Sequence, residues 1–425
     1  MMSTKDHLSV RNSHLVIGGF DTVTLTEQFG TPLYVTNEAR IRANYQRFKE
    51  DFPDADIYYA AKSNYNLTVL KILAEEGAGA DVFSGGELYC ALKAGIPSDK
   101  ILFNGNSKTD AELEMAVKNN VRISVDSLDE LRTLSEIAHK YDHHVGISFR
   151  VNPDVSPRTH PKIATGLRES KFGIPSDEVI ATYKEARSLE NIKIAGIHCH
   201  IGSQILDLSP FVEATKKMID LVKELARIGI QLEFIDIGGG LGISYENEVA
   251  PSPKDLADVV LPVFVEGTKA LEIRPKLILE PGRYIMADTT ILLAKVNTVK
   301  SAYRKFVGVD AGFNLLVRPA MYDAYHRIVV ANKAGEKSSA VYTIVGPICE
   351  SGDVLARERF LPKIEKDDLI AILDVGSYGF SMSSQYNGRP RCAELLVHDG
   401  KVDIIRKEES YDDLLANQVL PSRFR

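Results

Sequence analysis

The sequence has few cysteines, no long apolar run and no large excess of charge of one sign. Its four cysteines, Cys90, Cys199, Cys349 and Cys392, are scattered, and none forms a Cys-x-x-Cys pair. This usage favours reduced thiols in a cytoplasmic protein, and we expect neither disulfides nor a metal site. No apolar stretch approaches the ~18 residues of a transmembrane helix. Residues 1–10 contain no apolar region of the kind found in signal peptides.

The overall composition is that of a globular protein with more than one domain. The 425 residues are 44% hydrophobic and 26% charged, with a net charge of −7. This negative charge argues against general binding to nucleic acids or membrane surfaces. The length suits a barrel of roughly 250 residues together with a second domain.

Eight short apolar segments, each followed by a stretch of helical periodicity, repeat through the middle of the chain. The candidate strands span residues 57–61, 80–83, 100–103, 122–125, 145–151, 194–198, 234–237 and 276–279. Apolar residues at i, i+3 and i+4 predict helices at residues 67–76, 86–94, 110–119, 127–140, 176–189, 210–228 and 253–271. Short parallel strands need crossover helices, so this pattern predicts an α/β fold with a (β/α)8 TIM-type barrel. An open doubly wound sheet is the alternative that periodicity leaves open.

The segments before and after this repeat alternate apolar and polar residues, as β structure does. Residues 10–35 contain strand-like runs, and Thr36 is the expected N-cap of a helix that continues to Phe52. Later candidate strands span residues 291–299, 306–309, 327–330, 341–345, 369–373 and 393–397. We predict three parts: N-terminal strands at 1–35, a barrel at 36–284, and a C-terminal all-β domain at 285–425 that also takes in the N-terminal strands.

The predicted strand ends carry polar groups, and Lys62 is the most informative of them. It follows the apolar run Ile57–Ala61 directly. In a barrel all eight strand ends face one mouth, where barrel enzymes carry out chemistry. Desolvation there would lower the pKa of a lysine, and a deprotonated amine can form a Schiff base. A lone strand-end lysine is more often one whose stem packs while its ammonium reaches water.

A triple glycine, Gly238-Gly239-Gly240, lies between a predicted strand and helix and could offer backbone N–H groups to an anion. Ser203, after another strand end, could add a hydroxyl donor. The spacing matches neither the dinucleotide fingerprint nor a P-loop, so the phosphate of a small cofactor suits it better. A glycine-rich barrel turn without a ligand is the alternative.

Glu280 and His200 end two further strands. A carboxylate in a dry mouth could keep a ring nitrogen protonated, although Glu280 could equally pair with Arg283. His200 could stack on a planar ring, and His198 could line the same face, although each would more often be a core histidine. Together with Lys62 and a phosphate cradle, these groups are what pyridoxal phosphate requires.

Several motifs resemble those of the alanine-racemase-fold (fold type III) pyridoxal phosphate decarboxylases. They are Tyr59-Ala60-Ala61-Lys62-Ser63-Asn64, His200-Ile201-Gly202-Ser203-Gln204, Asp236-Ile237-Gly238-Gly239-Gly240, Glu280-Pro281-Gly282-Arg283 and Gly346-Pro347-Ile348-Cys349-Glu350-Ser351-Gly352-Asp353. The resemblance covers nearly the whole chain and is greatest to the members that act on diaminopimelate. Ser63 departs from the alanine that the family more often has, which should not affect the chemistry.

The resemblance implies a role for each matching residue. Lys62 would hold pyridoxal 5'-phosphate as a Schiff base, Glu280 would pair with its ring nitrogen, and His200 would stack on the ring. The residues expected around the phosphate are Ser203, Gly238, Gly239, Gly240, Gly282, Arg283 and Tyr386. Cys349 would return a proton to the product and would come from the second subunit of a homodimer. For Cys349 the alternative is a small buried hydrophobe.

The expected substrate depends on groups that could bind its distal end. An ammonium there needs only a carboxylate, whereas an ammonium together with a carboxylate also needs a guanidinium. The chain offers both kinds of group, in Arg283, Arg318, Tyr322, Glu350 and Tyr386. This set favours meso-2,6-diaminoheptanedioate as substrate and L-lysine as product. The alternatives are ornithine, lysine or carboxynorspermidine as substrate, a non-catalytic homologue that acts as a binding partner, and, for Arg318, a surface salt bridge.

Overall fold

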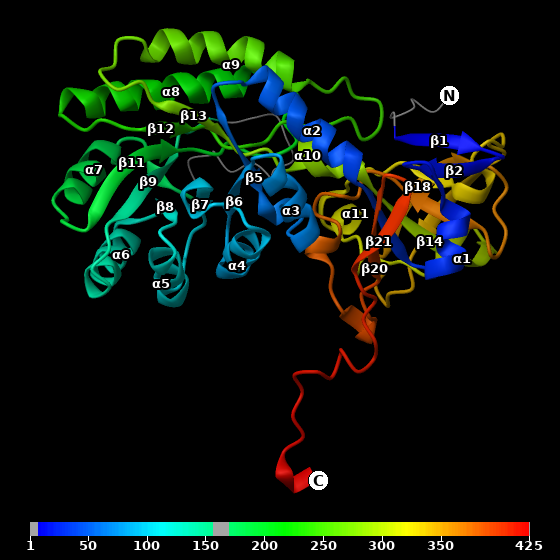
Figure 1. Ribbon diagram of the computed structural model, residues 1–425. Coiled ribbons are helices and arrows are strands. Elements are labelled where there is room, and N and C mark those ends of the chain that lie inside the picture. The colour runs from blue at the N-terminus through cyan, green and yellow to red at the C-terminus, as the bar shows by residue number, and fades with distance from the viewer. Residues whose placement is uncertain (1–6, 156–169, 425) are drawn as a thin grey trace. The chain divides into compact units, whose positions relative to one another are not determined.

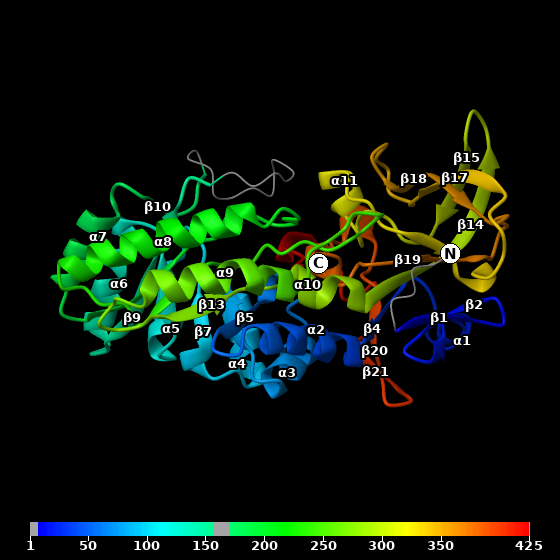
Figure 2. The same cartoon turned by 90° about the horizontal axis from the view of Figure 1, so that it is seen from above.

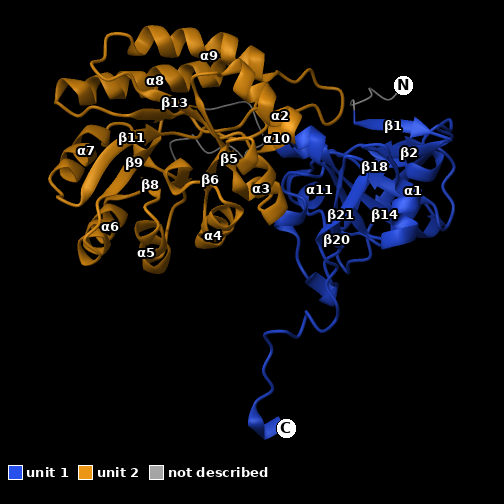
Figure 3. Ribbon diagram, viewed as in Figure 1, with its two compact units in different colours: residues 1–41, 286–425 blue, residues 42–285 orange. Residues whose placement is uncertain are grey.

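The computed structural model describes residues 7–155 and 170–424. The chain forms two compact units: Arg42–Ile285, and Met1–Ile41 together with Met286–Arg425 (Figure 3). Among the described residues, we find no helix with the length and apolar character needed to span a bilayer.

The first unit is a closed barrel of parallel strands. Its strands are β5 (Asp56–Ala60), β6 (Gly79–Val82), β7 (Ile101–Phe103), β8 (Arg122–Val125), β9 (Val145–Asn152), β11 (Ile192–His198), β12 (Phe234–Asp236) and β13 (Lys276–Leu279). They pair in the order β9-β11-β12-β13-β5-β6-β7-β8, and β8 pairs with β9 to close the ring. The short strand β10 (Ile174–Pro175) pairs with β9 from outside this ring. The predicted barrel is therefore confirmed, and an open sheet is excluded.

Amphipathic helices surround these strands (Figure 1). They are α3 (Leu67–Glu75), α4 (Gly85–Ala94), α5 (Asp110–Lys118), α6 (Leu128–Lys140), α7 (Val179–Arg187), α8 (Ser209–Arg227) and α9 (Pro253–Thr268). In α8 the buried side chains include Phe211, Met218, Val222 and Leu225, which recur at helical spacing. Helices α8 and α9 lie side by side along the barrel (Figure 2). All seven helices were predicted to within a few residues at each end.

The predicted N-cap of the preceding helix is wrong. Thr36 belongs to strand β4 (Leu33–Asn37), and its hydroxyl bonds that of Thr290 at 2.8 Å. Helix α2 (Glu38–Asp51) begins two residues later, where the Asn37 side chain accepts a hydrogen bond from the N–H of Arg40. The strand continues through Thr36 because β4 pairs with a neighbour on each side.

The second unit contains most of the β structure. Strands β1 (Leu8–Arg11), β2 (His14–Ile17) and β3 (Phe20–Asp21) form a sheet of their own. Strand β4 joins a second sheet with β14 (Thr290–Ser301), β15 (Lys305–Val309), β16 (Ile328–Val330), β17 (Ala340–Val345), β18 (Val354–Leu361), β19 (Leu369–Ile372), β20 (Ala393–His398) and β21 (Lys401–Arg406). Because β4 lies between β14 and β20, the N-terminal segment is part of this sheet, as predicted.

Several elements of this unit were not predicted from the sequence. Helix α1 (Thr22–Phe29) lies where only strands were expected, because its threonines and Val23 resemble a strand, while the side chain of Asp21 caps the helix. Strand β18 carries charges at its centre, and β21 is largely exposed, so neither shows an apolar run. The short helices α10 (Arg283–Met286) and α11 (Arg318–Tyr322) were not predicted either.

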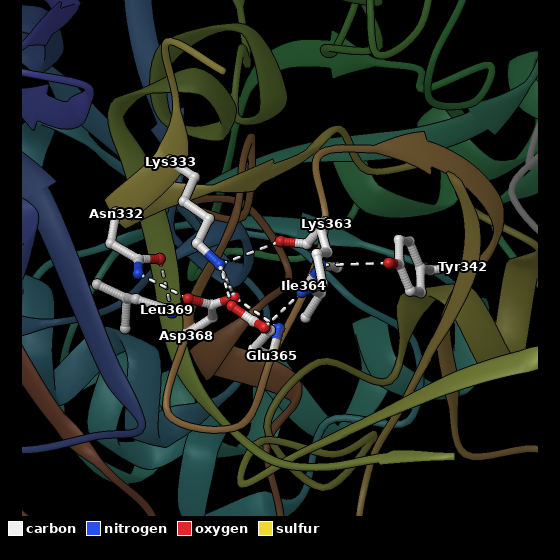
Figure 4. A network of polar contacts seen from close by, with 8 residues as sticks. All are labelled: Asn332, Lys333, Tyr342, Lys363, Ile364, Glu365, Asp368 and Leu369. Carbon is white, nitrogen blue, oxygen red and sulfur yellow. Dashed lines mark hydrogen bonds and ion pairs between the residues drawn. The ribbon is translucent and has the colours of Figure 1, made fainter. Parts of the chain in front are cut away.

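A buried carboxylate holds together the loop before β19 (Figure 4). Asp368 accepts hydrogen bonds from Asn332 at 2.8 Å, from Lys333 at 2.7 Å and from the backbone N–H of Glu365 at 2.7 Å. Asn332 in turn accepts from the N–H of Leu369 at 3.0 Å. The buried charge is thus fully paired, and the network fixes the entry into β19.

Candidate active site

Lys62 lies just after β5, in a single turn of 3-10 helix at residues Ala61–Ser63. Its ammonium is 2.7 Å from Asp81 Oδ2 on the neighbouring strand β6. The lysine side chain is 32% exposed, whereas that of Asp81 is 1% exposed. Lys62 is therefore an ion-paired amine that solvent can reach.

Asn104, after β7, joins this ion pair to Glu280. Its side-chain amide donates to Asp81 Oδ1 at 2.6 Å and to Glu280 Oε1 at 2.7 Å. The amide nitrogen is the atom that must face the two carboxylates, because a carbonyl oxygen there would be repelled. A buried polar chain therefore runs from Lys62 across three strand ends to Glu280.

Glu280 follows β13 and is almost fully buried. Burial alone would raise its pKa. The nearby His198, whose Nε2 lies 3.4 Å from Oε2 of Glu280, and the charge of Lys62 outweigh burial. Together they hold the pKa of Glu280 well below its usual range. Burial and the charge of Glu280 raise the pKa of the adjacent Asp236. The two adjacent carboxyl groups therefore have pKa values shifted in opposite directions, with that of Glu280 lowered and that of Asp236 raised.

His198, Asp236 and Glu280 could also be read as metal ligands, since an atom from each lies within 4.8 Å of the others. Several of their atoms already have protein partners. Asp236 Oδ1 accepts from the N–H of Gly238 at 2.8 Å, and His198 Nδ1 lies 3.0 Å from the hydroxyl of Ser124. The expectation of no metal stays a prediction.

The glycine turn lies against two strand ends and His200. A Cβ on Gly239 would lie 2.0 Å from the carbonyl oxygen of Glu280, and one on Gly240 would lie 2.4 Å from that of Gly202. Gly238 and Gly240 have φ values of 71° and 120°, which favour glycine. The turn is therefore built for close backbone approach.

The sequence suggested that the N–H groups of this turn are available to an anion, but two of the three already donate to protein acceptors. The N–H of Gly238 is used by Asp236, and that of Gly239 donates to His200 Nδ1 at 3.2 Å. Only the N–H of Gly240 has no acceptor within the described residues. Burial, with the charges of Lys62 and Arg150, lowers the pKa of His200 well below its usual value. Its ring is neutral and can lie against a planar group without adding charge.

Arg283 places a cation beside the same turn. Its guanidinium donates to Ser203 Oγ at 2.8 and 3.2 Å and to the hydroxyl of Tyr245 at 2.8 Å. Glu280 is bound by Asn104 and His198, so the Glu280–Arg283 pair considered from the sequence does not form. Gly282, between them, packs against the side chains of Ala60 and Ser63 at the end of β5.

The other unit brings together Cys349, Glu350 and Tyr386. The hydroxyl of Tyr386 donates to Glu350 Oε1 at 2.7 Å and lies 3.9 Å from Cys349 Sγ. Asn387 holds the cysteine from both sides, with Nδ2 to Sγ at 3.2 Å and Oδ1 accepting from its N–H at 2.9 Å. Glu350 and Cys349 raise the pKa of Tyr386 to about 12. Cys349 is exposed, so it is not the buried hydrophobe considered above.

Arg318 and Tyr322 lie at the two ends of α11, in the same unit. Arg318 is 5% exposed, which excludes a surface salt bridge, and its Nη1 lies 2.9 Å from His326 Nε2. Tyr322 is partly buried. Each unit therefore has its own set of chemically active groups: an amine, carboxylates and an anion turn in the barrel, and a thiol with a buried guanidinium in the β unit.

The barrel group fits pyridoxal phosphate. The ionised, buried carboxylate matches its ring nitrogen, and the neutral imidazole matches its ring face. The lysine matches its aldehyde, and the glycine N–H together with the arginine matches its phosphate. Sequence reasoning missed Asp81, Asn104 and His326 as site residues. Asp81 could have been found, since it is a lone acid inside an apolar strand.

The closed barrel and the groups at its strand ends are those of a pyridoxal-phosphate-dependent barrel enzyme. Comparisons with known proteins agree with this class. Residues 38–287 match the family "Pyridoxal-dependent decarboxylase, pyridoxal binding domain". The chain belongs to this family, and the family assignment implies a pyridoxal cofactor.

Relatives that match nearly the whole chain share the name diaminopimelate decarboxylase. The chain is 56% identical to the diaminopimelate decarboxylase of Archaeoglobus fulgidus, over 99% of each chain, and 48% identical to that of Methanothermobacter thermautotrophicus, over 96% of each. A solved diaminopimelate decarboxylase from M. jannaschii, which has also been solved with L-lysine, superposes with a TM-score of 0.93 at 42% identity, over 98% of this chain and 99% of that one.

Proposed function

We propose that the protein catalyses the pyridoxal-phosphate-dependent decarboxylation of meso-2,6-diaminoheptanedioate to L-lysine and CO2, the last step of lysine biosynthesis. Relatives of 43–56% identity over nearly the full length, all named diaminopimelate decarboxylase, support this reaction. The observation that carries it is the buried chain from Lys62 through Asp81 and Asn104 to Glu280.

The barrel residues bind and orient the cofactor. When bound, pyridoxal phosphate accepts the electron pair that CO2 leaves behind. Lys62 holds its aldehyde, and Glu280, ionised at neutral pH, keeps the ring nitrogen protonated. His200 lies against the ring without competing for that proton. We assign the phosphate to the N–H of Gly240, with Ser203, Gly282, Arg283 and Tyr386. Gly238 and Gly239 shape the turn, because their N–H groups already donate to Asp236 and His200.

Cys349 returns a proton to the carbon that has lost CO2. Its thiol is exposed and is held by Asn387 and Tyr386, so it is oriented and accessible. A thiol can act as a general acid once Lys62 has been released. In our proposal Cys349 and Glu350 are supplied by the second subunit of a homodimer, and each active site combines residues of both chains.

The distal end of the substrate sets the specificity. Its carboxylate needs a guanidinium and its ammonium needs a carboxylate. We assign the carboxylate to Arg318, Arg283, Tyr322 and Tyr386, and the ammonium to Glu350. The burial of Arg318 supports this assignment, because its attraction for a carboxylate is less screened there than at an exposed site.

The experiment is product identification combined with one substitution. Purified protein incubated with pyridoxal phosphate should convert meso-2,6-diaminoheptanedioate to L-lysine and CO2 and should leave ornithine and lysine unchanged. Arg318→Met should lower kcat/KM for this substrate about 100-fold or more, the range expected when a partner of a charged hydrogen bond is removed. The control is Arg357→Met, since Arg357 is exposed on β18. Normal activity in Arg318→Met, or equal activity with ornithine, would reject the substrate.

A further inference from the structure

Arg318 does not project from the short helix α11 unsupported. Its Nη1 lies 2.9 Å from Nε2 of His326, a residue with no exposed surface. The other ring nitrogen, Nδ1, lies 2.9 Å from the carbonyl oxygen of Leu373, just beyond β19. The imidazole thus connects the arginine to the sheet.

The two contacts define how the ring is protonated. A guanidinium can only donate, so Nε2 must accept; a carbonyl oxygen can only accept, so Nδ1 must carry the hydrogen. A ring protonated at both nitrogens would turn an N–H toward the arginine. The arrangement is therefore that of a neutral imidazole with its hydrogen on Nδ1.

The histidine extends a backbone ladder. Strand β16 pairs antiparallel with β19, with Ile328 opposite Ile372. One step further, the N–H of Leu373 donates to the carbonyl of Arg327 at 2.9 Å. The carbonyl of Leu373 receives its hydrogen bond from the side chain of His326. The ring is held by the sheet itself and does not depend on a mobile side chain.

We propose that His326 is the positioning residue for substrate selection: it orients the Arg318 guanidinium toward the distal carboxylate of the substrate. This inference rests on the proposed function. His326 takes one of the five N–H donors of the planar guanidinium, and because these donors form a rigid fork, fixing one fixes the directions of the rest. His326 itself touches no reacting atom.

Two isosteric substitutions separate the contacts of the ring. Asparagine places an amide near the position of Nδ1, so His326→Asn keeps the bond to Leu373 and loses the one to Arg318. Glutamine reaches the position of Nε2, so His326→Gln keeps an acceptor for Arg318. A purely structural role would make the two variants fail together. The matched control is His398→Gln, on β20 of the same unit.

The readout is equilibrium binding to the holoenzyme of two ligands that differ by one carboxylate. L-lysine keeps the distal carboxylate of the substrate, whereas 1,5-diaminopentane lacks it. Absorbance titration of the bound cofactor gives both dissociation constants. We expect His326→Asn to weaken L-lysine binding about 10- to 100-fold, the loss of one charged hydrogen bond. The dissociation constant of 1,5-diaminopentane should change less than about twofold, and His326→Gln should recover most of the loss.

Other outcomes overturn the inference. Equal weakening of both ligands, or unchanged L-lysine binding in His326→Asn, would show that the ring does not orient Arg318. If His326→Asn gives no holoenzyme, His326→Leu undergoes the same titration with the same criteria. Arg318→Met is measured alongside. If Arg318→Met leaves L-lysine binding intact, the substrate assignment fails. If it weakens L-lysine binding while the His326 variants do not, only the positioning role of His326 fails. In the double variant Arg318→Met/His326→Asn, the losses should not add.

Discussion

The barrel and the β unit hold their functional groups in opposite ways. In the barrel, Asp81, Asn104 and Glu280 are nearly inaccessible, and Asn104 bonds both to Asp81 on the neighbouring strand and to Glu280 across the barrel. In the β unit, Cys349 and Tyr386 lie at the surface and are held by side chains of nearby loops.

The difference follows from what each group has to do. A carboxylate that must stay charged beside a ring nitrogen needs fixed donors in a site shielded from water, which closed parallel strands provide. A thiol that delivers a proton must reach the substrate and be recharged, which requires exposure. Arg318 is the exception in the β unit, since it is buried. This suits the carboxylate recognition that we propose for it, which benefits from a rigid guanidinium.

The largest effect should come from the barrel. Lys62→Ala should remove the absorbance band near ~420 nm that a lysine–pyridoxal Schiff base gives, and should lower kcat by about 10⁴-fold. Lys71→Ala, on the exposed face of α3, is the matched control and should keep both. A band that persists in Lys62→Ala would place the covalent attachment on another lysine and undo the assignment of the barrel group.

The next effect should come from the β unit and leave cofactor binding intact. Cys349→Ala should lower kcat by about 10²–10³-fold, as expected for loss of a general acid, while the absorbance band remains. Cys90→Ala, on α4, is the control. If Cys349→Ala kept full activity, the exposed thiol would not be the proton donor.

Mixing the two inactive variants tests whether the two regions meet across a dimer. If each site uses Lys62 of one chain and Cys349 of the other, subunit exchange between Lys62→Ala and Cys349→Ala restores one intact site per mixed dimer. Activity should then recover to roughly a quarter of the wild-type value, from the statistics of a symmetric dimer. Activity that stays at the level of the separate variants after verified exchange would mean that each chain builds its site alone.

The smallest effect concerns stability near the barrel mouth. Burial raises the pKa of Glu87, on α4, to about 7, although its hydrogen bond from the N–H of Phe83 and the charge of Lys62 oppose this. A carboxyl with a raised pKa holds its proton more tightly in the folded state, so its ionisation destabilises the fold as pH rises from about 4.5 to about 7.

Glu87→Gln should therefore be more stable than the wild type at pH 8, by about 1–2 kcal/mol, and no more stable at about pH 4, below the ordinary pKa of a glutamate. Thermal melts of both proteins at the two pH values measure this difference. A stability difference independent of pH would show that Glu87 is not strained by ionisation.

The barrel was predictable because its strands are short apolar runs that end on polar residues, each followed by helical periodicity. The predicted secondary structure was wrong where the residue types suit more than one element. Thr22–Phe29 is rich in threonine and looked like a strand, but the cap by Asp21 and the burial of Leu25 make it a helix. Thr36 looked like an N-cap, but pairing on both sides keeps it in β4.

The sequence by itself determined the barrel, the β-rich second unit and the residue types that a pyridoxal decarboxylase needs, because periodicity and strand-end chemistry are local properties of the chain. Only the tertiary structure decided that Asp81 and Asn104 connect Lys62 to Glu280, that two of the three glycine N–H groups are already used, and that His326 holds Arg318. These contacts join residues from different strands, and which side chains face one another depends on strand order and register, which no single segment of the sequence encodes.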